Sequence, residues 1–191
     1  ERLDLERLIA EVWFTDEIRT ERPTPQDEAK WGYAVIEHSL WTAIPQLWNR
    51  LSELTFKVTG ETLPLSVSPI KISSWMGGDR DGNPNVTADV TKEILRLARW
   101  MAADLYLRDV EELLSQLSMS NCSSELAALC PEGVDEPYRH ILRSLRERLV
   151  ATRTWAETSE PPEPGLIHSD ADLIAPLQLC YDSLLACGMN I

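Results

Sequence analysis

One long amphipathic pattern most constrains what this chain can fold into. Thr87 is suited to cap a helix, and the residues that follow place apolar side chains at helical spacing. That apolar face comprises Val90, Ile94, Leu97, Met101, Leu105, Val110, Leu113 and Leu117. A helix of about 30 residues is about 45 Å long, which is too long for a compact unit of 191 residues to cover alone. The pattern therefore predicts a larger parent structure.

Helical patterns occupy most of the remaining sequence. We expect a first helix from residue 1 to about Phe14. A second helix, capped by Thr24, should run to about Leu54 and be kinked or broken at Pro45, because proline removes an amide donor. Later helices are expected over residues 123–129, from 137 to about 157, and over about 17 residues from Ser169 or Asp170, the last broken early at Pro176.

Residues 63–86 interrupt the helical patterns. Residues 70–75 are partly alternating and β-branched, which predicts a strand. A loop rich in glycine and charge follows, from Met76 to Asn85. The predicted fold is therefore mainly α, with one or two short strands. We expect a single partial domain over residues 1–191, made of a helical segment (1–62), the strand with its loop (63–86) and a second helical segment (87–191).

The balance of charge excludes several classes of partner. The chain has 31 acidic and 18 basic side chains, which gives a formal net charge of −13. Such a surface repels phosphate backbones and anionic lipids, so we expect neither nucleic-acid nor membrane binding. We expect no leader peptide, because the first residues are a charged helical run, and no apolar run is long enough to span a bilayer. Its charged start and apolar end predict a piece cut from a longer chain.

The cysteines, the histidines and one basic cluster are weaker candidates for function. The cysteines form no CxxC pair, so we expect free, buried thiols in a reducing compartment, and the histidines are expected to be structural or solvated. The basic cluster is either a solvated helix face paired with Glu136 and Glu147 or a subunit contact or anion site. These residues are Cys122, Cys130, Cys180 and Cys187; His38, His140 and His168; and Arg139, Arg143, Arg146 and Arg148.

The loop after the predicted strand is where we most expect chemistry. Asp79, Arg80 and Asp81 place three charges in a row at the end of a strand, which is where α/β enzymes hold their sites. A charged turn with an internal Arg–Asp pair explains the same residues. A calcium loop is excluded, because its sixth and twelfth positions would hold Pro84 and Val90. No glycine-rich phosphate-loop motif is present either.

The loop sequence SWMGGDRDGNP, residues 74–84, resembles the phosphoenolpyruvate carboxylase family. The resemblance covers nearly the whole chain, is weakest over residues 121–171, and is closest to bacterial members in the sequence DEAKWG of residues 27–32. Further matching segments are Val86-Thr87, residues 97–99, EELLSQLSM (111–119), TDEIR (15–19), PTPQDE (23–28) and Trp41.

This resemblance implies a definite reaction and setting. The family carboxylates phosphoenolpyruvate with bicarbonate, giving oxaloacetate and phosphate, with Mg²⁺ or Mn²⁺ and through carboxyphosphate and an enolate. The fold implied for the whole enzyme is an eight-stranded α/β barrel of the TIM type with many extra helices, in which residues 70–75 would form an early strand. The enzyme is expected to be a cytoplasmic homotetramer under allosteric control, so this chain's partners would include the rest of its own polypeptide.

The resemblance also assigns roles to loop residues. Trp75 would lie near the apolar methylene side of the substrate, and the charged residues would shape the floor of the site. The residues expected to line the substrate site are Trp75, Gly77, Gly78, Asp79, Arg80, Asp81 and Asn83. The family often has two arginines after its Asp-Glu-Ile sequence, which bind a sugar-phosphate activator in some members. Here Arg19 is followed by Thr20, so Arg19 alone is left as a possible effector or anion site.

The family's principal catalytic residues are missing from this sequence. Its catalytic histidine lies in a His-Pro-Thr motif upstream, and its metal-binding carboxylates lie downstream, so neither belongs to these residues. The chain alone is therefore expected to be inactive, to bind no metal and to expose apolar faces that favour self-association. The alternative is a non-catalytic helical scaffold or interaction domain that retains the loop as a structural turn.

Overall fold

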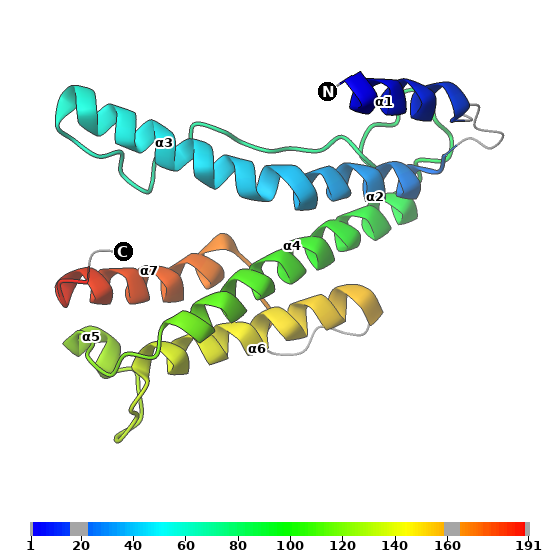
Figure 1. The fold of residues 1–191 in the computed structure, drawn as a ribbon. Coiled ribbons are helices and arrows are strands. Elements are labelled where there is room, and N and C mark those ends of the chain that lie inside the picture. The colour runs from blue at the N-terminus through cyan, green and yellow to red at the C-terminus, as the bar shows by residue number, and fades with distance from the viewer. Residues whose placement is uncertain (1, 16–22, 159–164, 190–191) are drawn as a thin grey trace.

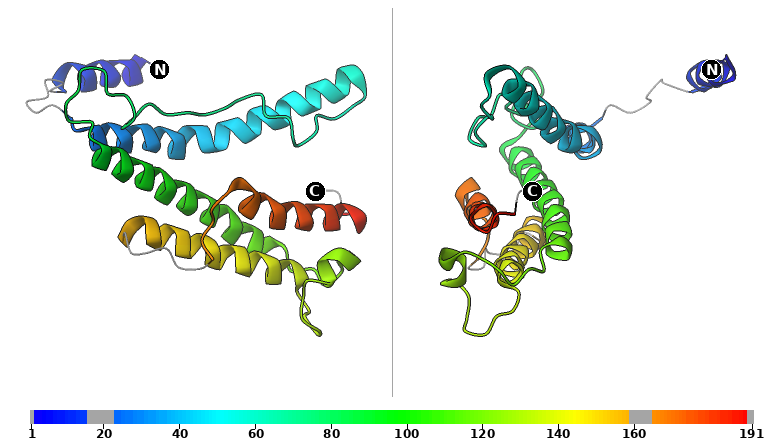
Figure 2. Two further views of the ribbon diagram at one scale, coloured as in Figure 1. Left: turned by 180° about the vertical axis from the view of Figure 1, so that it is seen from behind. Right: turned by 60° about the vertical axis from the view of Figure 1, so that its left-hand side comes forward.

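The computed structural model describes residues 2–15, 23–158 and 165–189, and they are mainly helical (Figure 1). Helices α2 and α3 form one long arm, helices α4, α6 and α7 form a bundle, and α1 lies apart from both (Figure 2). The elements are α1 (Arg2–Phe14), α2 (Pro25–Val35), the π-helical η1 (Ile36–Leu40), α3 (Trp41–Thr59), α4 (Ala88–Gln116), α5 (Ser124–Ala127), α6 (Pro137–Thr158) and α7 (Asp170–Ala186).

The arm begins at the predicted cap. The side chain of Thr24 accepts from the N–H of Asp27 at 3.2 Å, and the Asp27 carboxylate accepts from the Thr24 hydroxyl at 2.7 Å. These bonds from Thr24 hold the pKa of Asp27 below its usual range. The arm ends at Thr59, five residues beyond the predicted end at Leu54, where Gly60 takes a left-handed conformation with φ 78°. Glycine adopts such a φ without a Cβ clash, which makes it a favourable helix terminator.

Of the kink or break expected at Pro45, the break does not occur. Pro45 lies inside α3, and the helix continues through it. The irregular turn instead lies just before, in η1, where the N–H of Trp41 donates to the carbonyl of Ile36, five residues back. A proline in a helix costs one backbone hydrogen bond and some crowding, and on this exposed arm the helix tolerates that cost.

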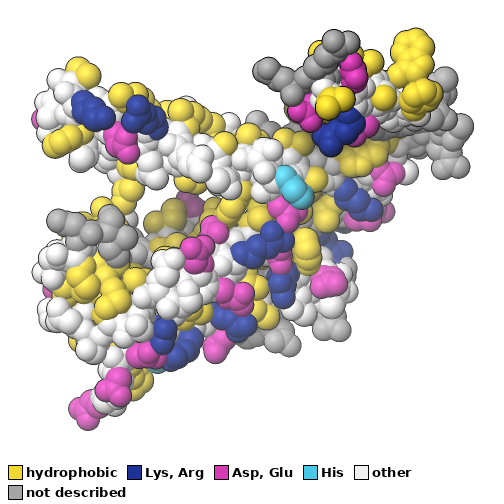
Figure 3. Space-filling view, viewed as in Figure 1, with side chains coloured by type: hydrophobic (Ala, Val, Ile, Leu, Met, Phe, Trp, Pro, Cys, Tyr) yellow, Lys and Arg dark blue, Asp and Glu magenta, His cyan; other side chains and the backbone are white. Residues whose placement is uncertain are grey.

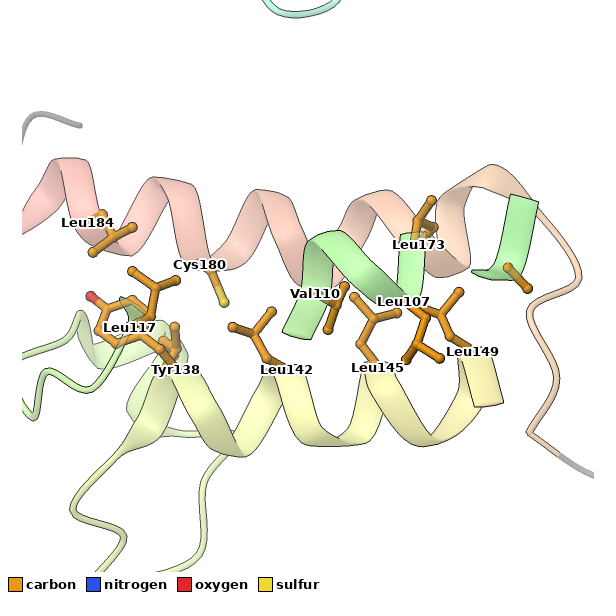
Figure 4. Packing of buried hydrophobic residues seen from close by; sticks show 12 residues of the cluster. Leu107, Val110, Leu117, Tyr138, Leu142, Leu145, Leu149, Leu173, Cys180 and Leu184 are labelled. Atoms are coloured by element: carbon orange, nitrogen blue, oxygen red, sulfur yellow. The ribbon is translucent and has the colours of Figure 1, made fainter. Parts of the chain in front are cut away.

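The bundle contains the main hydrophobic core. In Figure 4, leucines from α4 and α6 point toward one another, and Leu173, Cys180 and Leu184 of α7 close the third side. Tyr138 is fully buried, and its hydroxyl lies 2.9 Å from that of Ser183, so its polar atom is satisfied. The buried members of this core are Ala103, Leu107, Val110, Leu117, Leu126, Tyr138, Leu142, Leu145, Leu149, Leu173, Cys180 and Leu184.

The expected break of the last helix at Pro176 is also wrong. Ser169 caps α7 as predicted, and the helix runs unbroken to Ala186. Pro176 offers no N–H to the carbonyl of Asp172, and that oxygen instead accepts from the Arg148 guanidinium at 3.4 Å. Arg148 also pairs with the Asp172 carboxylate at 2.7 Å and holds its pKa well below the usual range. A side chain from α6 thus satisfies the group that proline leaves free.

A smaller cluster joins the arm to the bundle. Ala29 and Tyr33 of α2 pack on Ile94 of α4, and the Tyr33 hydroxyl donates to the Ile94 carbonyl at 3.4 Å. Farther along α4, an ionic network crosses between the same two parts. Arg108 pairs with Glu37 at 2.7 Å and with Asp104 at 2.6 Å, and Asp104 also pairs with Arg153 of α6 at 2.7 Å.

The strand predicted over residues 70–75 is wrong. Residues 61–75 run as an extended segment along α3, and the Trp48 indole N–H donates to the Val67 carbonyl at 3.0 Å (Figure 1). A strand requires a neighbouring backbone for its hydrogen-bond ladder. Within residues 2–15, 23–158 and 165–189 no such neighbour is present, and no strand forms. The local alternation was real, but it is not sufficient to make a strand.

The weaker candidates are mostly structural. The four cysteines are free as predicted, although only Cys180 is fully buried, and burial raises its pKa to about 11. The basic cluster is paired: Arg139 and Arg143 contact Glu136 as predicted, while Glu111 and Asp172 take the place expected for Glu147. Among the described helices, none is long and apolar enough to cross a membrane.

Candidate functional site

Short-range hydrogen bonds shape the loop between the extended segment and α4. The N–H groups of Gly78 and Asp79 donate to the carbonyl of Trp75, at 2.9 and 3.0 Å. The Asp79 carboxylate then accepts from the N–H of Asp81 at 3.1 Å, which is a local aspartate turn. These contacts give the loop a defined path of its own, at the point where the chain enters α4.

Gly77 anchors the loop on α4. It is buried and has φ 74°, and an added Cβ would lie 2.6 Å from Cδ1 of Ile94. The Thr91 hydroxyl donates to its carbonyl at 2.6 Å. Both the left-handed backbone and the close approach to Ile94 require glycine here. By contrast, Gly82 also has a positive φ, but nothing lies within 4 Å of its added Cβ.

Helix α2 holds the other side of the loop. The indole N–H of Trp75 donates to the Glu28 carboxylate at 3.3 Å. One turn along α2, a Cβ on Gly32 would lie 2.5 Å from Sδ and Cε of Met76, so the missing side chain makes room for this methionine. Residues 75–77 are therefore held between α2 and α4, one after another.

The charged residues of the loop face solvent. Asp79, Arg80, Asp81 and Asn83 are exposed, and so are Gly78 and the ring of Trp75. Within the described residues, Arg80 makes no ion pair, so the internal Arg–Asp pair considered above does not form. The loop thus presents an unpaired guanidinium beside two carboxylates and an exposed indole, a set able to contact an anionic ligand with an apolar part.

The possible effector site at Arg19 and the metal ligands do not belong to the described loop. Arg19 falls outside the described residues. The described part of the chain contains no group of three His, Cys, Asp or Glu side chains able to hold a metal ion. The donor set needed for Mg²⁺ or Mn²⁺, mainly carboxylates gathered at one point, is therefore not provided by these side chains.

Sequence reasoning missed the residues that hold the loop. Glu28 and Gly32 are four residues apart on α2, and Thr91 and Ile94 are three apart on α4. Residues three or four apart lie on one helix face, and this spacing can be read from the sequence. Nothing in the sequence states, however, which loop residue each face meets, because the contacts span up to 47 positions.

Comparisons with known proteins match the whole chain. A family model described as phosphoenolpyruvate carboxylase matches residues 1–191. The chain is 56% identical to the phosphoenolpyruvate carboxylase of Pseudomonas paraeruginosa and 58% identical to that of Pseudomonas fluorescens strain Pf0-1, in each case over 98% of the chain. It is 57% identical to that of Marinobacter nauticus over 100% of the chain. In all three cases the chain spans 22% of the relative's own length.

Proposed function

The chain belongs to the phosphoenolpyruvate carboxylase family, and we propose that it is part of an enzyme that carboxylates phosphoenolpyruvate with bicarbonate, giving oxaloacetate and phosphate. The observation that carries this proposal is the family-model match over residues 1–191, together with more than half identity to named relatives over at least 98% of the chain. The enzyme would be a cytoplasmic homotetramer under allosteric control, acting as a lyase. Mg²⁺ or Mn²⁺ would be held by other parts of the polypeptide and would stabilise the charge that develops on phosphoryl and enolate oxygens.

We propose that the loop lines the substrate site of that enzyme. Phosphoenolpyruvate carries a phosphate, a carboxylate and an apolar methylene group, and the loop offers matching chemistry. Arg80 has no ion-pair partner among the described residues, so its guanidinium is available to an anion. The exposed face of Trp75 suits the methylene side. Asp79, Asp81 and Asn83 would then shape the floor of the site.

The isolated chain is proposed to be inactive. It lacks the His-Pro-Thr motif and the metal-binding carboxylates that the family uses, and the described residues contain no metal-ligand cluster. The whole enzyme is proposed to have an α/β barrel of the TIM type with many extra helices, of which this chain supplies part.

The proposal is tested by changing Arg80 in the full-length enzyme. Arg80→Ala should raise the KM for phosphoenolpyruvate about tenfold or more, because a charge-assisted hydrogen bond is worth about 1.5–3 kcal/mol. Oxaloacetate formation gives the rates. Lys92→Ala is the matched control: it removes an exposed cation of α4 whose ion pair is with Asp89 and not with a loop residue, and it should leave KM unchanged. An unchanged KM for Arg80→Ala would favour the structural-turn alternative.

A further inference from the structure

We propose that Glu28 is a positioning residue for the substrate site, and that it acts by fixing the orientation of the Trp75 ring. The inference rests on the proposed function, in which Trp75 lines the substrate's apolar side. It adds a residue from a different helix, 47 positions earlier in the chain. Glu28 itself would not touch the substrate.

Glu28 accepts a hydrogen bond from the indole of Trp75. The Trp75 ring is 69% exposed, so packing alone does not hold it. Its polar atom, the indole N–H, donates to Oε1 of Glu28 at 3.3 Å. An exposed aromatic ring without such a bond samples several rotamers and loses entropy when a ligand orders it. A ring held in advance avoids that loss, so the bond to Glu28 should strengthen substrate binding.

The next turn of α2 supports the same arrangement. Gly32 lies four residues after Glu28, on the same helix face, and leaves the space that Met76 occupies. Met76 directly follows Trp75, so α2 contacts two consecutive loop residues with two residues of one face. Helix α2 is itself fixed to α4 by Tyr33 and Ile94. The backbone of Glu28 is therefore held in a fixed place relative to the loop, and its exposed carboxylate reaches Trp75 from there.

The bond is tested in the full-length enzyme by the KM for phosphoenolpyruvate and by kcat. Glu28→Ala should raise KM about three- to tenfold. It should leave kcat nearly unchanged, because the bond orients the Trp75 ring for substrate binding and takes no part in the chemical step. Glu28→Gln retains an oxygen acceptor for the indole and should restore most of the affinity. If Glu28→Gln were as impaired as Glu28→Ala, the effect would come from the lost charge in the first turn of α2, and the proposal would be overturned.

A double-mutant cycle separates positioning from helix stability. Trp75→Phe retains an aromatic ring but has no N–H, so Glu28→Ala should add nothing in that background. A stability effect of Glu28 on α2 would persist there and would overturn the proposal. Glu93→Ala is the matched control, because Glu93 accepts from Gln26 across the same pair of helices without contacting the loop.

Trp75→Ala distinguishes failure of this inference from failure of the proposed function. If Trp75→Ala raises KM and Glu28→Ala does not, Trp75 contacts substrate but Glu28 does not position it. If Trp75→Ala leaves KM unchanged, the assigned role of Trp75 fails, and the inference about Glu28 falls with it. The expected result is a larger KM for Trp75→Ala than for Glu28→Ala.

Discussion

The bundle and the arm are built from equally regular helices, yet they bury their apolar side chains very differently. Helix α6 buries seven residues, including Leu142, Leu145 and Leu149, whereas α3 buries none of its described residues. Leu47, Leu51, Leu54 and Phe56 of α3 are exposed, and a groove of about 460 Å³ lies between α3 and residues 65–70. Figure 3 shows hydrophobic side chains on α1 and α3, while charged side chains gather over α4 and α6.

This difference shows which part of the chain provides its own core. The three bundle helices cover one another's apolar faces, so the bundle encloses a hydrophobic core of its own, as a folded unit does. The arm has an amphipathic pattern without a cover, which agrees with the exposed apolar faces expected from the sequence. Since the relatives are several times longer than this chain, we propose that the rest of the polypeptide covers the arm. The predictions that follow test this contrast.

The largest expected effect compares a leucine from each part. Leu142→Ala should lower the free energy of unfolding of this chain by about 2–5 kcal/mol, because it opens a cavity at a fully buried site. Leu51→Ala on α3 should change it by less than about 1 kcal/mol, since that side chain is already exposed. Urea unfolding followed by circular dichroism gives both values. Equal effects would show that the arm is packed as tightly as the bundle.

A pair of glycines tests how the loop joins the two parts. Gly77→Ala should cost about 2–3 kcal/mol, because the left-handed backbone and the contact with Ile94 both resist a Cβ. Gly82→Ala, the control, has a similar φ but open space and should cost only about 1 kcal/mol. Thermal unfolding of the two variants measures the difference. If both cost the same, the close approach to α4 does not stabilise the loop.

The ionic network between arm and bundle gives a smaller effect. Asp104→Ala leaves Arg108 and Arg153 without their shared carboxylate and should cost about 1–2 kcal/mol, since Asp104 is buried but both arginines reach solvent. Glu37→Ala removes the partly exposed ion pair with Arg108 and should cost less than about 1 kcal/mol. Unfolding in 1 M salt should reduce the loss in each case.

The smallest effect concerns pH and the start of α7. Arg148 and the cap of Ser169 hold the pKa of Asp172 below that of an unfolded aspartate. A depressed carboxyl pKa adds stability at neutral pH, and this contribution is lost as the pH falls below about 4. Arg148→Ala should therefore flatten the decrease of stability in acid. A pH titration of the melting temperature measures this, and a slope equal to that of the unchanged chain would contradict it.

Local signals predicted the helices well. Thr24, Thr87 and Ser169 cap helices as expected, because a cap depends on a side chain and a backbone N–H only three residues away. Likewise, the glycine-rich loop lies where the sequence placed it. The breaks expected at Pro45 and Pro176 did not occur. The rule that proline breaks a helix considers only local sequence, whereas the result depends on the contacts around each helix. At Pro176 one such contact comes from a guanidinium of another helix.

The sequence by itself determined where helices begin, which of their faces are apolar, and which family the loop motif belongs to, since each of these depends on neighbouring residues or on direct similarity. Only the tertiary structure decided that residues 70–75 have no strand partner among the described residues, and that Glu28 and Gly32 meet the loop. Those outcomes require backbones and side chains far apart in sequence to approach within a few ångströms. The energies that bring them together come from packing between elements, which no local pattern contains.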